Sequence, residues 1–327
     1  MSARPVECAG FCDLQVNGFG GVDFNAADLT PEGVDRAASA MGETGVTLFL
    51  ATIITSSFEH FAACARAITA AGTTALAGIH MEGPYLSPED GPRGAHLRAH
   101  IQPATGDDFA RRQDAADGRI RLVTLAPEVP GALDLIDRLV ATGIRVALGH
   151  SGASVDTIVE AVARGATLST HLGNGCGPTL PRHPNLLWEQ LAADQLVATF
   201  IVDGHHLTPS TVKAMVRAKT HARSILVTDA TAAAGQPEGD YRLGGQTVRR
   251  TASGRVTLAG LDKLAGSALT LDEAVGNVVR FAGVSVDDAL AMASTQPAAA
   301  IGLVPRGRIN ATWDDHLARF VVRAITV

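Results

Sequence analysis

The 327-residue sequence is poor in aromatic residues, in excess basic charge and in long apolar runs. Aromatic residues make up 4% of the chain and hydrophobic residues 46%, so a large core must be built mainly from aliphatic side chains. Lys and Arg number 27 against 33 Asp and Glu, whereas nucleic-acid-binding proteins normally present a basic surface. No apolar run reaches the ~18 residues expected of a membrane span. We therefore expect neither a nucleic-acid partner nor membrane association.

Cysteine is scarce as well, with only four residues, Cys8, Cys12, Cys64 and Cys176. Scattered cysteines in a long chain are typical of reduced thiols rather than of a disulfide framework. Cys8 and Cys12 form half of a zinc-binding pattern, but no second pair accompanies them. Because residues 1–5 also lack the hydrophobic core of a signal peptide, we expect a cytoplasmic protein.

The first two-thirds of the chain alternates apolar strand-like segments with helical ones. The spacing is close to the ~30 residues of a strand–helix unit. Eight apolar segments end near Gln15, Thr52, Glu82, Ala126, His150, His171, Asp203 and Asp229. The pattern predicts an α/β fold, a (β/α)8 TIM-type barrel over residues 10–239 that helices in 265–302 continue. An open doubly wound sheet is the alternative, but it gathers ligands at one switch point.

Helix starts are marked by capping residues. Thr30 and Thr208 each precede a proline, which suits the first helical position. Ser154 can cap a helix that runs to about Arg164. The glycine-rich alternation at 241–258 predicts a hairpin. We expect 240–264 and 303–327 to form a small β subdomain.

Three strand-end residues can bind a metal. Gly83 and Pro84 follow Glu82 and fix a tight strand exit, while His150 and His171 end two further apolar runs. Taken singly, the Glu is explained as a solvated strand end and each His as a core residue. Together, at one barrel rim, two His and one Glu suit a divalent metal with an open coordination position.

The neighbouring strand ends predict the rest of the site. Asp229 ends the eighth strand, where it lies within reach of the other ligands and can transfer protons. A buried Asp that caps the following turn is the alternative, and we favour the catalytic role. The first strand carries Gln15 and Asn17, which are poor ligands for a transition metal but good hydrogen-bonding groups. A single bound metal is the simpler inference.

The chain resembles the N-acetylglucosamine-6-phosphate deacetylase family of the amidohydrolase superfamily, from Asp13 onward. The resemblance is carried by eight motifs in the same order: Asp13–Gly18, His80–Pro84, Arg93–His96, Gly149–Ser151, Thr170–Leu172, Asp203–His206, Thr228–Ala230 and Leu264–Ser267. The Gln-x-Asn form at 15–17 is similar to the branch that uses one metal, with Gln15 and Asn17 in place of a second metal's ligands.

This resemblance implies roles for individual residues. It implies Glu82, His150 and His171 as ligands of one zinc or iron ion and Asp229 as the catalytic aspartate. His206 matches a histidine that contacts the sugar and the reacting carbonyl. The resemblance further implies that His96, Asn174, Gly175 and Arg182 bind the substrate. Arg182 would reach the phosphate in the neighbouring subunit of a homodimer.

The sequence departs from the family at two places. Residues 173–178 read Gly-Asn-Gly-Cys-Gly-Pro, where the family usually has an aromatic-Asn-Ala-Met run, so substrate identity is open. The N-terminal segment is also short, which predicts an N-terminally truncated β-sandwich with an edge that needs covering.

The predicted function is the metal-dependent deacetylation of N-acetylglucosamine 6-phosphate to glucosamine 6-phosphate and acetate. One alternative is deacetylation of another N-acetyl hexosamine, with or without phosphate, or of a related small amide. The other is a sugar-phosphate-binding barrel without activity.

Overall fold

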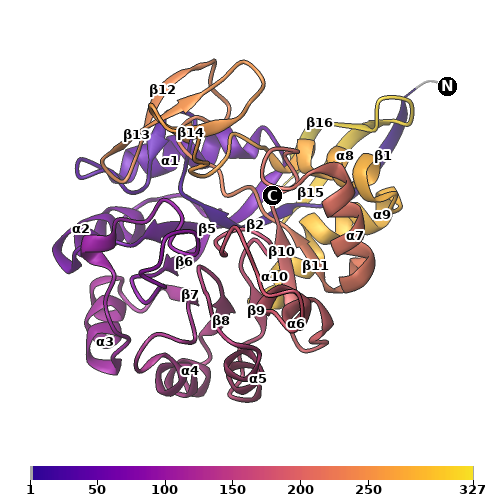
Figure 1. Cartoon of the computed structure of the whole chain (residues 1–327). Coiled ribbons are helices and arrows are strands. Elements are labelled where there is room, and N and C mark those ends of the chain that lie inside the picture. Colours follow the sequence, from indigo (N-terminus) through magenta and orange to yellow (C-terminus); the bar gives the residue numbers. More distant parts are fainter. Residues whose placement is uncertain (1–2, 327) are drawn as a thin grey trace.

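Eight parallel strands form a barrel in the computed structural model, which describes residues 3–326 (Figure 1). The strands are β2 (Phe11–Val16), β5 (Val46–Ile54), β6 (Leu76–Glu82), β7 (Ile120–Leu125), β8 (Arg145–Leu148), β9 (Leu168–Ser169), β10 (Val197–Phe200) and β11 (Ser224–Leu226). They pair in chain order from β2 to β11. The ends of the sheet meet where the Asp229 amide donates to the Gln15 carbonyl at 2.9 Å. The predicted (β/α)8 barrel is confirmed.

Helices follow the strands and cover the barrel. They are α1 (Pro31–Gly42), α2 (Phe58–Thr69), α3 (Gly106–Ala115), α4 (Ala132–Ala141), α5 (Val155–Ala163), α6 (Leu186–Ala192), α7 (Pro209–Lys219), α8 (Leu271–Ala282), α9 (Val286–Ala293) and α10 (Thr295–Ala300). The predicted caps are present, since the Thr30, Ser154 and Thr208 side chains accept backbone hydrogen bonds from the first turns of α1, α5 and α7.

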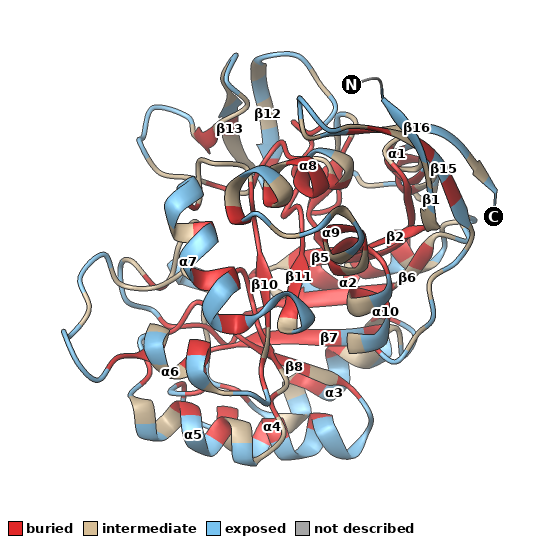
Figure 2. Ribbon diagram, turned by 90° about the vertical axis from the view of Figure 1, so that its right-hand side faces the viewer, coloured by how far each residue is buried: buried red, intermediate tan, exposed pale blue. Residues whose placement is uncertain are grey.

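The barrel strands are buried on both faces, as expected of a parallel sheet enclosed by helices (Figure 2). The surrounding helices turn buried faces inward and exposed faces outward. The buried core is mostly Ala, Val, Leu and Ile, which agrees with the low aromatic content. This rigid scaffold fixes the strand ends, from which the site residues project.

Two three-stranded antiparallel sheets lie beside the barrel. One contains β12 (Gly239–Leu243), β13 (Gln246–Arg250) and β14 (Val256–Leu258), at the top left of Figure 1. The other contains β1 (Arg4–Ala9), β15 (Arg308–Asp314) and β16 (Arg319–Thr326), at the top right. The sequence interpretation placed 240–264 and 303–327 in one β subdomain, whereas the structure places their strands in two separate sheets.

The two sheets differ because they bury different apolar surfaces. Trp313 and Phe320 of the second sheet pack into the barrel core, whereas Leu243 and Val248 of the first belong to a separate small cluster. The sequence did not predict β1, which pairs antiparallel with β15 and covers that edge. How these parts divide into domains stays a prediction.

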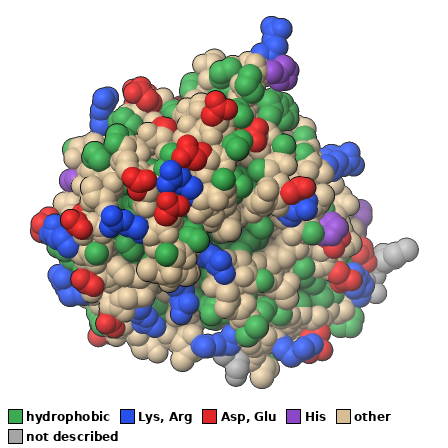
Figure 3. All heavy atoms as spheres, turned by 90° about the horizontal axis from the view of Figure 1, so that it is seen from below, with side chains coloured by type: hydrophobic (Ala, Val, Ile, Leu, Met, Phe, Trp, Pro, Cys, Tyr) green, Lys and Arg blue, Asp and Glu red, His purple; other side chains and the backbone are tan. Residues whose placement is uncertain are grey.

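The remaining short elements are β3 (Gly18–Phe19), β4 (Val22–Asp23) and the 3-10 turns at Arg98–His100 and His221–Arg223. Within residues 3–326, no helix is both long and apolar enough to cross a membrane. On the face seen from below in Figure 3, acidic and basic side chains are interspersed. That face carries no broad area of one charge.

Candidate active site

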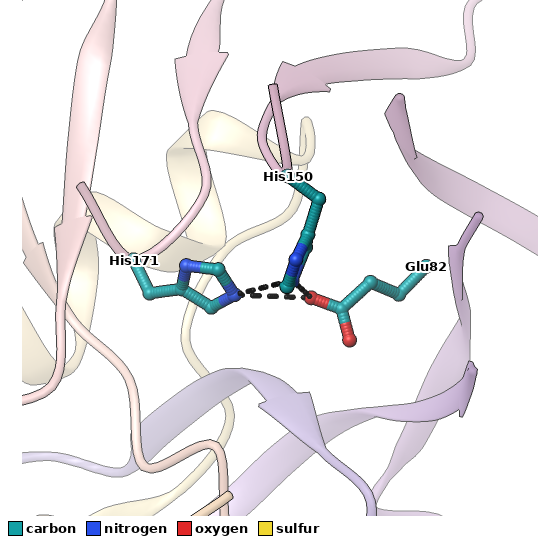
Figure 4. Close-up of side chains that lie close together, drawn as sticks. All are labelled: Glu82, His150 and His171. Carbon is teal, nitrogen blue, oxygen red and sulfur yellow. Dashed lines mark hydrogen bonds and ion pairs between the residues drawn. The ribbon is translucent and has the colours of Figure 1, made fainter. Parts of the chain in front are cut away.

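Three predicted metal-binding side chains converge at the barrel rim (Figure 4). Glu82 ends β6, and His150 and His171 each lie two residues beyond a strand, β8 and β9. The His171 Nε2 atom is 3.1 Å from Glu82 Oε1 and 3.1 Å from His150 Nε2. The His150 Nε2 atom is 3.3 Å from Glu82 Oε1. The structure therefore brings together the acid and the two imidazoles that the sequence predicted.

The chemistry of this cluster fits a cation. The His150 Nδ1 atom lies 2.9 Å from the Pro92 carbonyl, to which it can only donate, so Nε2 keeps its lone pair. Burial alone would raise the pKa of Glu82, but the adjacent imidazoles of His150 and His171 hold that pKa well below its usual range. An ionised carboxylate oxygen and an imidazole lone pair so close together suit a shared divalent ion.

Close packing fixes the His150 ring. A Cβ atom on Gly175 would lie 2.8 Å from His150 Nδ1, and one on Gly94 would lie 3.0 Å from its Cε1. Gly175 also has a φ of +59°, which favours glycine. The small residues of the 173–178 loop therefore allow that loop to approach the imidazole closely.

Gln15 on β2 and Asn17, directly after that strand, hold the two carboxylates of the site. The Gln15 Nε2 amide donates to Glu82 Oε1 at 2.8 Å, and the Asn17 Nδ2 amide donates to Asp229 Oδ1 at 2.6 Å. These are the hydrogen-bonding roles that amide side chains suit. That they replace the ligands of a second metal stays a prediction.

Asp229 lies three residues beyond β11 and is buried in the same pocket. Burial, followed by the negative charge of Glu82, raises the pKa of Asp229 to about 6, and the hydrogen bond from Asn17 opposes this shift. A carboxylate whose pKa lies near the working pH can both accept and return a proton.

His206 is held by Asp203, three residues beyond β10. Asp203 Oδ2 accepts from His206 Nδ1 at 2.7 Å, and Oδ1 accepts from the amides of His205 and His206 at 2.8 Å each. Burial would raise the pKa of Asp203, but His206 lowers it below its ordinary value. The pair therefore fixes which nitrogen of His206 faces the pocket.

These groups line one pocket of about 240 Å³. It contains the three metal-binding candidates with Asn17, His96, Asn174, Gly175, His206 and Asp229, and it is completed by Leu243, Lys263 and Leu264 from the segment around the small sheet. A larger cavity of about 570 Å³ lies between α8 and the β15–β16 hairpin, next to Asp203 and His205. We assign the site to the smaller pocket because it contains Glu82, His150 and His171, which could hold a metal ion.

The remaining predicted residues differ in position. His96 is buried with Nε2 3.3 Å from His150 Nε2, so it lies against the metal-binding cluster itself. Asn174 and Gly175 line the pocket. Arg182 does not, because it lies in an exposed loop before α6.

Sequence reasoning missed two contributors. Asp203 was noted as a strand end but given no role, although its position three residues before His206 is a usable signal. Lys263 was not noted. The one signal that could have found it is its position directly before the motif at 264–267.

The chain matches known proteins over most of its length. The model of the amidohydrolase family matches residues 7–314. The N-acetylglucosamine-6-phosphate deacetylase of Bos taurus is 37% identical over 311 residues, which cover 91% of this chain and 75% of that protein. The N-acetylgalactosamine-6-phosphate deacetylase of Shewanella sp. (strain ANA-3) is 35% identical over 296 residues, 89% of this chain and 73% of that protein.

A solved structure is similar as well. It is a mutant N-acetyl-D-glucosamine-6-phosphate deacetylase from Mycobacterium smegmatis in complex with N-acetyl-D-glucosamine-6-phosphate. The TM-score is 0.87 at 31% identity, over 98% of this chain and 85% of that one. The similarity includes the barrel and its additions.

Proposed function

We propose a function for this chain that follows from its family, because it belongs to the amidohydrolases and, within them, to the N-acetylglucosamine-6-phosphate deacetylases. It hydrolyses N-acetylglucosamine 6-phosphate to glucosamine 6-phosphate and acetate. It is a metal-dependent hydrolase. The observation that carries the proposal is the convergence of Glu82, His150 and His171 in one pocket with Asp229.

Glu82, His150 and His171 would hold one divalent ion, with zinc or iron as the preferred metals. Such an ion, when bound, polarises the acetamide carbonyl and lowers the pKa of the attacking water. Gln15 keeps the Glu82 carboxylate oriented through its 2.8 Å hydrogen bond.

Asp229 moves the proton in this mechanism. Its carboxylate takes a proton from the attacking water and later gives it to the nitrogen of the departing amine. Asn17 orients Asp229, and Asp203 orients His206. When its ring is doubly protonated, His206 donates from Nε2 to the reacting carbonyl oxygen, where one well-placed donor contributes about 3 kcal/mol to transition-state stabilisation.

A second substrate is supported by a specific observation. The glycine-rich loop at 173–178 lines the pocket with smaller side chains than the family usually has, and one similar relative is an N-acetylgalactosamine-6-phosphate deacetylase. The C4 epimer is therefore the competing substrate. Comparing kcat/KM for the two phosphorylated sugars decides between them.

The assembly is part of the proposal. We infer a homodimer in which Arg182 reaches the phosphate in the neighbouring active site, which is consistent with its exposed position outside its own pocket. All four cysteines are free thiols in the described structure, and this favours the cytoplasm.

The experiment that tests the function is hydrolysis of N-acetylglucosamine 6-phosphate by the wild type and by Asp229→Asn. The variant cannot accept the proton, so we expect kcat to fall by roughly 10²–10⁴ while metal content is unchanged. Asp107→Asn, an exposed substitution on α3, is the matched control and should keep full activity. Wild-type turnover by Asp229→Asn would refute the assignment of the base.

A further inference from the structure

We propose that Lys263 recognises the phosphate of the substrate bound in its own subunit. This rests on the proposed function, and it names a specificity-determining residue that belongs to the same chain as the catalytic aspartate. Among the described residues that line the pocket, Lys263 is the one Lys or Arg. A lysine ammonium is a point charge well suited to a phosphate.

The backbone on both sides fixes where Lys263 lies. On its N-terminal side, the Leu258 amide donates to the Lys263 carbonyl at 2.9 Å, and Thr257 forms a bridge with Leu264. On its C-terminal side, the Ser267 amide donates to the Asp229 carbonyl at 2.9 Å. The lysine therefore sits on a short segment that is tied at one end to the small sheet and at the other to the catalytic aspartate.

The small sheet is in turn anchored across the pocket. The Gln246 side-chain amide donates to the Ala95 carbonyl at 3.1 Å, next to His96. The Gly244 amide donates to Asp23 Oδ2 at 2.9 Å. These contacts join the sheet to the loop after β6 and to β4, so the Lys263 segment is held against the barrel rim.

The charge of Lys263 is available for a ligand. Within residues 3–326 its side chain makes no ion pair or hydrogen bond, and it is only partly exposed. The neighbouring Asp262 is engaged elsewhere, with Oδ1 2.6 Å from Arg255 Nη2. A surface lysine is normally well exposed or paired with a carboxylate. Lys263 is only partly exposed, and it lines a pocket that contains no other Lys or Arg among the described residues.

The pocket needs such a cation. Glu82 is committed to the proposed metal ion, Asp229 carries a carboxylate that repels a phosphate, and Asn174 and Gly175 offer only neutral polar groups. Arg182 lies outside this pocket in its own chain. In a pocket of about 240 Å³, Lys263 is the group that can balance the charge of a bound phosphate from within the subunit.

The test compares Lys263→Met and Lys263→Arg with the wild type on N-acetylglucosamine 6-phosphate and on free N-acetylglucosamine. The Met variant keeps the apolar stem and loses the charge, so we expect KM for the phosphorylated sugar to rise about tenfold or more. Competitive inhibition by glucosamine 6-phosphate should weaken by a similar factor. The Arg variant should recover most of both losses. Lys213→Met, exposed on α7, is the matched control.

The outcomes separate this inference from the proposed function. A wild type that hydrolyses neither sugar refutes the function itself. An active wild type whose KM and product inhibition are unchanged in Lys263→Met overturns the assignment of Lys263. An equal loss of kcat/KM on both sugars, with inhibition by glucosamine 6-phosphate unaltered, also overturns it. A lysine with a purely structural role would affect the phosphorylated and the free sugar alike.

Discussion

At the scale of single residues, the site is built on unusual backbone conformations. His150, His171 and Asp229 have φ values of +51°, +29° and +51°. Residues other than glycine rarely adopt this left-handed region. Such conformations cost about 1–3 kcal/mol each and persist where surrounding contacts fix them. The His171 amide donates to Thr199 Oγ1 at 2.7 Å, and the Asp229 amide to the Gln15 carbonyl. The strain coincides with the residues proposed for the chemistry.

The Asn17–Asp229 hydrogen bond predicts a pH effect. Asp229 must be ionised to act as a base, so activity falls as the pH drops through its pKa. Asn17→Ala removes a hydrogen bond that lowers this pKa, so the acid limb of kcat/KM should move to higher pH by roughly one unit. A pH–rate profile measures the shift.

The matched control for this substitution is Asn310→Ala, an exposed residue on β15. Its profile should overlay that of the wild type. If the acid limb of Asn17→Ala stays in place or moves to lower pH, Asn17 does not tune the base.

The sequence predicted the meeting of Glu82, His150, His171 and Asp229 because a barrel brings strand ends to one rim. It could not predict the position of Lys263. That position depends on the hydrogen bond between the Ser267 amide and the Asp229 carbonyl, which holds the segment after β14 against the barrel. Such a long-range contact leaves no periodic signal in the sequence. The roles of the site residues stay predictions until variants are measured.

At the scale of elements, local signals predicted most of the barrel. The caps at Thr30, Ser154 and Thr208 begin α1, α5 and α7 where the sequence placed them. β1 was missed because Arg4–Ala9 contains a proline and little alternation, and it is ordered by pairing with β15, about three hundred residues away in the chain. The sequence could not show that the two small sheets contact different apolar clusters, because the cluster that a strand joins depends on tertiary packing.

The end of α6 offers a stability test. The buried Lys219 of α7 donates from Nζ to the carbonyls of Gln190 and Ala193, at 2.8 and 2.6 Å. Lys219→Met leaves these carbonyls unpaired, so the free energy of unfolding should fall by about 1–3 kcal/mol. Urea unfolding measures the change, with Lys213→Met on the same helix as the exposed control. Equal midpoints for the two variants would show that Lys219 does not stabilise α6.

At the scale of the whole molecule, the proposed homodimer completes each active site with a residue from the other chain. Arg182 is exposed in the loop before α6, and Trp188 on that helix is 54% exposed. Exposed Trp and Arg side chains are enriched in interfaces. This surface is where we expect the second subunit of the proposed homodimer.

Mixed dimers test the shared site. Arg182→Met and Asp229→Asn are co-expressed with different tags, and the heterodimer is isolated. One of its two sites then combines an intact Asp229 with an intact Arg182 from the other chain, so a low-KM activity absent from both parents should appear. A heterodimer that keeps the KM of the Arg182→Met parent would mean that the arginine does not act across the interface.

The proposed chemistry requires one metal ion held jointly by Glu82, His150 and His171. Elemental analysis of the purified wild type and of His171→Ala measures this directly. We predict about one zinc or iron ion per chain in the wild type, and a large loss in the variant at unchanged folding by circular dichroism. Equal metal content in the two proteins, or a fully active wild type without bound metal, would show that these three residues do not hold a catalytic ion.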